Sequence, residues 1–329
     1  MKNNRNRIYY KFRSFDNDGY NLNNLQNDCI FASNISQLND PFEGLIDNSK
    51  MSIELSVLKR LGADKQAEIL KTGLNDFLEL RNKTGIYSMS QDWQSELLWA
   101  HYADSHKGFC IEYDIEYLTR FYYQRSYFIK VKYVDSPVNV SVLKMFKKKL
   151  ATVEIVKLMN GIKSLPWSYE KEYRIVFDEC GTKNIDKRGL KSVILGANIS
   201  NDNKLRILDI LSKKTVKVYQ AKLADNRYII DRELIHEFNE EIKEKDFFQD
   251  IDPFYLSEDY LEENYSKKHL IEKALNIVRA EPYVTKINHC TVLKEKNKTK
   301  ISIWAEIEKD WRPQVNFSFD EEVLKQLDI

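Results

Sequence analysis

The stretch of residues 85–113 constrains the fold of this chain more than any other part of the sequence. Its pattern predicts a strand at residues 86–90, a short helix at 95–103 and a second strand at 109–113. Gly108 follows the helix, and we expect it to end the helix in the left-handed conformation that glycine adopts readily. A strand, a helix and a strand in one short stretch indicate a domain that combines helices with sheet.

Residues 8–15 alternate between apolar and basic side chains. Tyr10 and Phe12 fall on one predicted face and Lys11 and Arg13 on the other, which is the period of a half-buried strand. A guanidinium at a strand end suits bidentate capture of a phosphate or diphosphate, although many surface strands also carry arginine. Arg13 is therefore a candidate anion ligand.

Acidic residues alternate over residues 169–177. A strand there would place Glu170, Glu172 and Arg174 on one face, with neighbours about 7 Å apart. One interpretation is a solvent-facing edge with balanced charges. The other is a site in which Arg174 or another cation keeps one carboxylate ionised while the second binds a hydroxyl group or a cationic transition state. The charge pattern alone leaves both interpretations open.

The spacing of apolar residues predicts the other elements. Strands are expected at residues 29–32 and 128–134, one or two helices within 53–80, and a long amphipathic helix at 142–162. A strand, helix and strand at 192–196, 204–211 and 216–221 predict a right-handed parallel crossover. A helix is expected at 232–245 and, from residue 267 onward, a helix, two or three strands and a short helix.

The composition bounds the size and the surroundings of the protein. Its 329 residues, 43% of them hydrophobic, suffice for a large domain and a smaller one, with a boundary that we place near Asp250. Lysine and arginine total 51 and aspartate and glutamate total 50, so no net field favours DNA or anionic membranes. No apolar run approaches the roughly 20 residues that span a bilayer, and the first residues lack a signal-peptide pattern. We therefore expect a cytoplasmic protein without a membrane partner.

Metal ligands are not evident in the sequence. The four cysteines are scattered without a C-x-x-C pair, which fits reduced thiols. His101 and His106 are too far apart to share a helix face. Residues 39–43, with the sequence NDPFE, predict a turn in which Asp40 caps the next residues, or alternatively the rim of a pocket.

Further polar and aromatic residues surround the informative stretch. Ser88 and Ser90 share a face of the predicted strand, which alone is a weak signal. Trp99, His101 and Tyr102 lie on the predicted helix, where they either face the core or line a pocket.

In chain order, the segments YKFR, NDPFE, YSMS, LLWAHYADSHKGFCIEYD, WSYEKEYR and VILG resemble a large bacterial family, domain of unknown function two-nine-seven-one. The resemblance spans residues 9–221 and does not extend to the C-terminal part of the chain. The family name supplies no activity, so a second resemblance carries the functional hypothesis.

The same residues are similar to the arginine, serine, glutamate pattern of ADP-ribosyltransferases, in which three strand-borne elements surround NAD. Arg13 matches the first-strand arginine, Ser88 and Ser90 the serine strand, and Glu170 and Glu172 the Glu-x-Glu element. The resemblance implies an α+β fold, with an ADP-ribosyltransferase-like mixed sheet flanked by helices in residues 1–250. Residues 251–329 are then a small α/β accessory module.

This resemblance also implies roles, with NAD as the substrate and without a metal. Glu172 would stabilise an oxocarbenium-like ribose, and Glu170 would activate the acceptor. By this resemblance, Arg13 would contact the diphosphate of NAD, and Ser88 or Ser90 would contact the ribose. The remaining residues would stack on a ring of NAD or form the pocket wall: Tyr87, Trp99, His101 and Tyr102. The acceptor, a protein or a nucleic acid, is not specified.

A transferase of this kind implies an intracellular bacterial toxin or phage-defence effector, whose C-terminal module binds a partner protein or senses a trigger. One alternative is a metal-dependent nuclease or phosphodiesterase, with a divalent ion bound by Asp40, Glu43, Glu170 and Glu172. Another is a non-catalytic module that senses a nucleotide.

Overall fold

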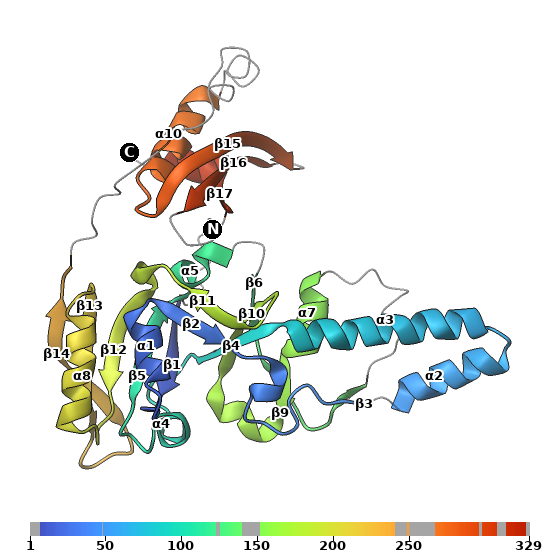
Figure 1. Ribbon diagram of the computed structural model, residues 1–329, viewed down its shortest axis with the longest axis horizontal. Helices are drawn as coiled ribbons and strands as arrows, with labels where there is room; N and C mark the ends of the chain where they lie inside the picture. The colour runs from blue at the N-terminus through green and yellow to red at the C-terminus, as the bar shows by residue number, and fades with distance from the viewer. Residues whose placement is uncertain are drawn as a thin grey trace. The chain divides into compact units, whose positions relative to one another are not determined.

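The computed structural model describes residues 7–47, 49–122, 126–139, 152–240, 249, 267–295, 298–307 and 314–326. The chain divides into two compact units, Met1–Glu240 and Glu241–Ile329 (Figure 1). Each unit is described by itself. The division falls close to the boundary expected near Asp250.

An eight-stranded mixed sheet forms the centre of the first unit, in the order β14, β13, β12, β5, β1, β4, β10, β6. Along the chain these strands are β1 (Ile8–Arg13), β4 (Gly85–Ser90), β5 (Phe109–Asp114), β6 (Ser126–Lys130), β10 (Glu172–Phe177), β12 (Leu190–Leu195), β13 (Val216–Leu223) and β14 (Ile230–Phe238). Strands β12 and β13 are parallel and are connected through helix α8 (Asn201–Leu211). The other neighbouring pairs are antiparallel. The expected α+β class is confirmed.

Short strand pairs and helices flank this sheet. The pairs are β2 (Cys29–Ala32) with β11 (Gly181–Asn184), β3 (Ile46–Asp47) with β8 (Val138–Asn139), and β7 (Lys132–Val134) with β9 (Ile162–Ser164). The helices are α1 (Tyr20–Gln26), α2 (Ser49–Arg60), α3 (Asp64–Lys83), α4 (Glu96–Tyr102), α5 (Ile115–Leu118) and α7 (Thr152–Asn160). Single 3-10 turns are η1 (Ile35–Gln37), η2 (Arg120–Tyr122) and η4 (Lys187–Gly189), and η3 (Leu165–Glu170) is longer.

Helix α4 anchors the strands that carry the candidate site. The Ser95 hydroxyl accepts a hydrogen bond from the Leu98 amide and so caps the helix. Leu98 and Trp99 then pack in one buried cluster with Phe12 of β1 and Cys110 of β5. Because the helix and both strands share this core, the side chains of β1 that face the cavity are held at fixed positions.

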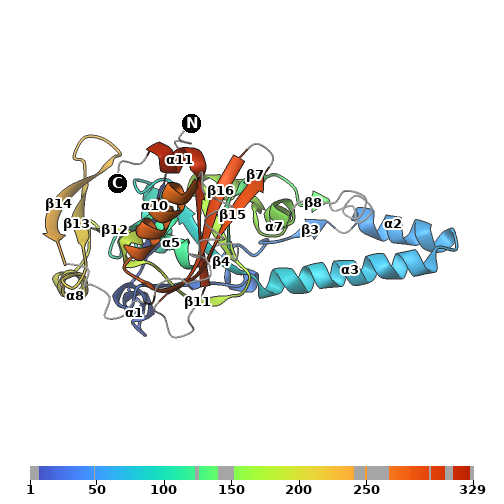
Figure 2. The same cartoon turned by 90° about the horizontal axis from the view of Figure 1, so that it is seen from above.

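The predicted helices are confirmed in part. Two helices, α2 and α3, occupy the region expected to hold one or two, and Figures 1 and 2 show them side by side, extending away from the sheet. Helix α7 matches the end of the helix expected at 142–162, of which residues 142–151 lie outside the described residues. Among the described residues, no helix has the length and apolar character needed to cross a bilayer.

The helix expected at residues 232–245 is wrong over its described part. Residues 230–238 form strand β14, which pairs antiparallel with β13 from Val216↔Phe238 to Leu223↔Ile230. Leu234 and Phe238 recur at helical spacing, but pairing with β13 decides the conformation, because strand propensity depends on neighbours. The many charged residues of β14 suit its place at the edge of the sheet.

The second unit contains a three-stranded antiparallel sheet with two helices. Its elements are α10 (Lys268–Arg279), β15 (Val284–Glu295), β16 (Lys298–Ile307), β17 (Gln314–Asp320) and α11 (Glu321–Gln326). Helix α10 buries Leu270, Ile271, Ala274, Leu275 and Val278, which form one stripe. The helix, strands and short helix expected from residue 267 onward are confirmed.

Candidate functional site

The candidate site is a cavity that opens where strands β1 and β4 separate. These two neighbours are paired in register only at Tyr10↔Ser90, whereas β4 pairs with β10 along its whole length. Beyond that pair, the Ser88 carbonyl oxygen accepts a hydrogen bond from the Lys11 amino group, at 2.7 Å, in place of one from a backbone amide of β1. The cavity has a volume of about 330 Å³ and is lined by β1, β4, α4, η1, β9, η3 and β10.

Strand β10 begins three residues later than its sequence pattern suggests. Glu170 belongs to turn η3, and Lys171 follows with a positive φ of 46° before the strand starts at Glu172. The expectation that Glu170, Glu172 and Arg174 alternate along one strand is therefore wrong for Glu170. Turn η3 nevertheless brings the carboxylate of Glu170 back to the cavity, where both acids are buried.

Arg174 is the centre of a buried ion-pair network. Its guanidinium is fully buried and donates to Glu172 Oε1 and Oε2, at 2.8 and 3.1 Å. It also donates to Glu43 Oε1 and Oε2, at 2.8 and 2.9 Å, and to the Asn160 carbonyl oxygen at 2.7 Å. These five bonds match the five N–H groups of a guanidinium, so its charge and its donors are satisfied inside the protein.

Lys163 connects the two acids of the cavity. Its amino group lies 2.5 Å from Glu170 Oε2 and 3.2 Å from Glu172 Oε2. The other Glu170 oxygen accepts a hydrogen bond from the Tyr102 hydroxyl at 2.5 Å, and that hydroxyl accepts one from the Asn39 amide at 2.6 Å. Tyr102 and Lys163 therefore fix the orientation of the Glu170 carboxylate.

The two neighbouring carboxylates have opposite pKa shifts. Burial opposes the ionisation of Glu172, but the charges of Arg174 and Lys163 outweigh it and lower its pKa to about 2. At Glu170 burial dominates, offset in part by Lys163, and the pKa is raised above its usual value. Glu172 is thus ionised at neutral pH, and Glu170 is the stronger base of the two.

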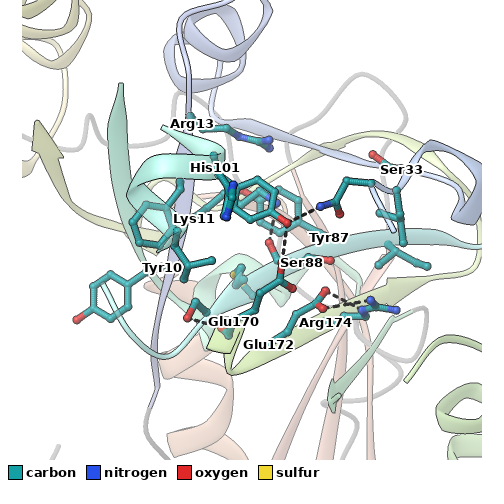
Figure 3. A pocket seen from close by; sticks show the side chains of 18 of the residues that line it. Tyr10, Lys11, Arg13, Ser33, Tyr87, Ser88, His101, Glu170, Glu172 and Arg174 are labelled. Atoms are coloured by element: carbon teal, nitrogen blue, oxygen red, sulfur yellow. Dashed lines mark hydrogen bonds and ion pairs between the residues drawn. The ribbon is translucent and has the colours of Figure 1, made fainter. Parts of the chain in front are cut away.

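A basic region faces the same cavity. Arg13 and Lys11 both lie over the ring of Tyr87, at 5.7 and 5.0 Å from its centroid. Burial and the neighbouring charge of Arg13 lower the pKa of Lys11 to about 7. Figure 3 shows Ser88 between Arg13 and the Glu172–Arg174 pair, so the cavity has cationic and carboxylate-rich parts.

The structure brings most of the predicted site residues to this cavity. The lining includes Arg13, Tyr87, Ser88, Ser90, His101, Tyr102, Glu170 and Glu172. Trp99 is the exception, because it is 0% exposed, donates its indole N–H to the Trp93 carbonyl oxygen at 2.8 Å and packs on Phe12. The expectation that Trp99 contacts a ligand is wrong, and the alternative that it faces the core is correct.

Two smaller expectations have different outcomes. Residues 41–44 form a turn in which Asp40 Oδ1 accepts from the Phe42 amide at 2.9 Å, as the NDPFE pattern predicts. Gly108 does not have a positive φ; the helix exit uses Asp104, Ser105 and His106 instead. Glycine is needed at position 108 because a Cβ would lie 2.1 Å from the Arg13 carbonyl oxygen.

Sequence reasoning did not identify Lys163 as a site residue. It lies at β9, just after helix α7, in a segment with no alternation or motif that marks it. Its 3% exposed side chain is the only signal, and that signal comes from the fold. A buried lysine is rarely tolerated without partners, and Glu170 and Glu172 supply them.

Cations pair with three of the four carboxylates that the metal-dependent alternative requires. Arg174 binds Glu43 and Glu172, and Lys163 binds Glu170 and Glu172. Among the residues that the structure describes, no group of three or more histidines, cysteines or acids could hold a metal ion.

One segment of the chain matches a family model. A family model described as a protein of unknown function (DUF2971) matches residues 98–175, which run from helix α4 to strand β10 and include Tyr102, Lys163 and both acids of the cavity. The match supports the resemblance to this domain-of-unknown-function family. Comparison with curated proteins and with solved structures gives no match.

Proposed function

We propose that this protein cleaves the nicotinamide bond of NAD and transfers ADP-ribose to an acceptor, either a macromolecule or water. The observation that carries the proposal is the pair of buried neighbouring carboxylates with opposite pKa shifts, Glu172 and Glu170. Two neighbouring carboxyl groups with different pKa values are the usual set for chemistry at a glycosidic carbon. The fold would then be of the ADP-ribosyltransferase-like kind.

Each group has a defined task in this reaction. The bond between ribose and nicotinamide breaks, its electron pair leaves on nicotinamide, and the cationic ribose is stabilised by ionised Glu172. The oxygen or nitrogen of the acceptor then bonds to the ribose carbon, and its proton passes to Glu170. Arg174 and Lys163 keep Glu172 in its charged form, so no reorganisation is required when the positive charge develops.

The remainder of the cavity supplies the binding groups for NAD. Arg13 offers a guanidinium to the diphosphate, and Ser88 offers a hydroxyl to the ribose between that group and Glu172. Tyr102 and His101 of α4 also line the cavity, as aromatic neighbours for nicotinamide. A volume of about 330 Å³ is at the lower end for ligand pockets, so it would enclose the nicotinamide riboside half and leave the adenosine half nearer to solvent.

Nicotinamide release from NAD by the purified full-length protein tests this proposal. We expect release in the presence of a chelator, and loss of release in the Glu170→Gln variant. The amide imitates the protonated acid, but its N–H₂ group faces either the Lys163 amino group or the Tyr102 hydroxyl, so loss of release counts for the proposal only if the variant melts cooperatively. Glu116→Gln, which changes an exposed acid outside the cavity, is the matched control and should keep full activity.

Glu172→Gln requires a folding control. Both Glu172 oxygens accept hydrogen bonds from Arg174, so an amide would place an N–H₂ group against these donors. Loss of activity counts for the proposal only if the variant melts cooperatively and still binds NAD. The proposal fails if wild-type protein releases no nicotinamide and labels no protein, RNA or DNA in a lysate.

As a consequence of such an activity, we propose a role as a toxin or defence effector, with the second unit binding a partner or sensing a trigger. Expression of the active protein would deplete NAD or modify an essential acceptor. Growth arrest that is relieved by Glu170→Gln is the expected result. Normal growth with soluble and NAD-cleaving protein would contradict a toxic role.

A further inference from the structure

Two basic side chains of β1 lie together in the cavity. Lys11 and Arg13 are two residues apart on one strand, so they leave the same face, and both lie over the ring of Tyr87. The Lys11 amino group is fixed by its 2.7 Å bond to the Ser88 carbonyl oxygen. Two neighbouring cations repel each other unless an anion lies between or beside them.

No such anion is supplied by the described part of the chain. Within it, neither Lys11 nor Arg13 forms an ion pair with a carboxylate. The acids of the cavity, Glu43, Glu170 and Glu172, are engaged by Arg174 and Lys163. The basic pair therefore has charge to offer to a ligand.

We propose that Lys11 and Arg13 together form a subsite for a phosphate or diphosphate group, and that occupation of this subsite adds a proton to Lys11. Arg13 supplies a permanent charge with a planar fork, and Lys11 supplies a compact charge that can be gained on binding. The identification of the ligand as NAD rests on the proposed function, whereas the anion subsite rests on the two side chains alone. Lys11 becomes a binding residue that couples affinity to pH.

The direction of this coupling follows from the surroundings of Lys11. The charged and titratable groups around the cavity lie on several elements: Tyr10 and Arg13 on its own strand, Tyr87 on β4, His101 and Tyr102 on α4, Glu43, Lys163 on β9, Glu170 on η3, and Glu172 and Arg174 on β10. Burial and Arg13 lower the pKa of Lys11 to about 7, while Glu172 and Glu170 act in the opposite sense. A bound anion stabilises the ammonium form, so the pKa of Lys11 rises in the complex.

Proton uptake should accordingly depend on pH. At pH 6 the free amine is already protonated, and binding takes up few protons. At pH 8 the free amine is mostly neutral, and binding takes up about one proton if the pKa in the complex is well above 8. Above pH 7 the affinity should fall by up to about tenfold per unit of pH, until the pKa of the complex is reached.

Titration calorimetry in buffers of different ionisation enthalpy measures this uptake. The probes are inorganic sulfate with wild-type protein, and NAD with the Glu170→Gln variant, which should bind NAD without cleaving it, because neither ligand changes its charge between pH 6 and pH 8. Wild-type protein should take up about one proton per ligand at pH 8. Lys11→Arg, which keeps a fixed charge, should bind at both pH values without uptake, and Lys11→Met should bind at least tenfold more weakly. The exposed Lys217→Met is the control and should behave as wild type.

The outcomes separate this inference from the proposed function. If sulfate binds with uptake that requires Lys11 but NAD does not bind, the subsite stands and the NAD reaction fails. If sulfate or uncleaved NAD binds without proton uptake, or if Lys11→Met retains the uptake, the subsite inference is overturned. Failure of both ligands to bind folded wild-type protein also overturns it. Thermal melting of each variant shows that weakened binding does not come from unfolding.

Discussion

Replacement of Arg174 by methionine is the strongest test of how the site is held together. The guanidinium is 0% exposed and makes five hydrogen bonds, four of them to the carboxylates of Glu172 and Glu43. Methionine has an unbranched side chain that can follow the same course but carries no charge, so both carboxylates remain buried without the guanidinium. Loss of one partner of a buried ion pair typically costs about 3–5 kcal/mol. For a unit of this size, about 2–4 °C per kcal/mol gives a decrease in melting temperature of roughly 6–20 °C.

Differential scanning calorimetry of the full-length variant measures this change. Lys222→Met, which breaks an exposed pair with Glu233, is the control and should melt close to wild type. Addition of Glu43→Gln and Glu172→Gln to Arg174→Met should recover part of the loss, because the uncompensated charges are then removed. If Arg174→Met melts within the error of wild type, the carboxylates are not buried as described and the account of the site is wrong.

Three further predictions concern neighbouring groups. Tyr102→Phe removes a hydrogen bond to Glu170, so the pKa of that acid should rise further. The acidic limb of the pH profile of NAD cleavage should then move to higher pH. An unchanged profile would exclude Glu170 as the base. Gly108→Ala brings a Cβ against the Arg13 carbonyl oxygen, so the free energy of unfolding measured in urea should fall by about 1–3 kcal/mol and NAD binding should weaken. Unchanged values would contradict the close packing. Because the pKa of Glu172 is lowered to about 2, its contribution to stability is complete above its unfolded pKa and is lost as the pH falls towards 2. The difference in urea midpoint between wild type and Glu172→Gln should shrink over that range, and a constant difference would refute the shift.

Local periodicity predicted those elements whose neighbours agree with their pattern. Strands β1 and β5 and helix α4 pack in one core, so propensity and tertiary contacts give the same answer there. Strand β14 has no such agreement. Its apolar residues are spaced as in a helix, and only pairing with β13 makes it a strand.

The residue types of the site were predictable from the sequence, but the partner of each side chain was not. The YEKEYR pattern points to Glu170 and Glu172, yet the left-handed Lys171 between them removes Glu170 from the strand. Long-range contacts then decide which cation each acid meets. Arg174 is two residues from Glu172 and could be anticipated, whereas Lys163 is brought to Glu170 by the turn between β9 and β10.

The same reasoning explains the error at Trp99. A large aromatic beside two pocket residues on one helix suggests a ligand contact, but a helix turns by about 100° per residue. Trp99 therefore faces the sheet, while His101 and Tyr102 face the cavity. The direction of each face depends on which side of the helix the sheet occupies, and the sequence does not state that side.

The central claim is that Glu170 and Glu172 serve NAD cleavage, and nicotinamide release in the presence of a chelator tests it most directly. Chromatographic measurement with purified wild-type protein, Glu170→Gln and Glu116→Gln needs no knowledge of the acceptor if water can replace it. The account predicts release by wild type and Glu116→Gln, and none above background by a folded Glu170→Gln variant. Equal release by wild type and folded Glu170→Gln would contradict it.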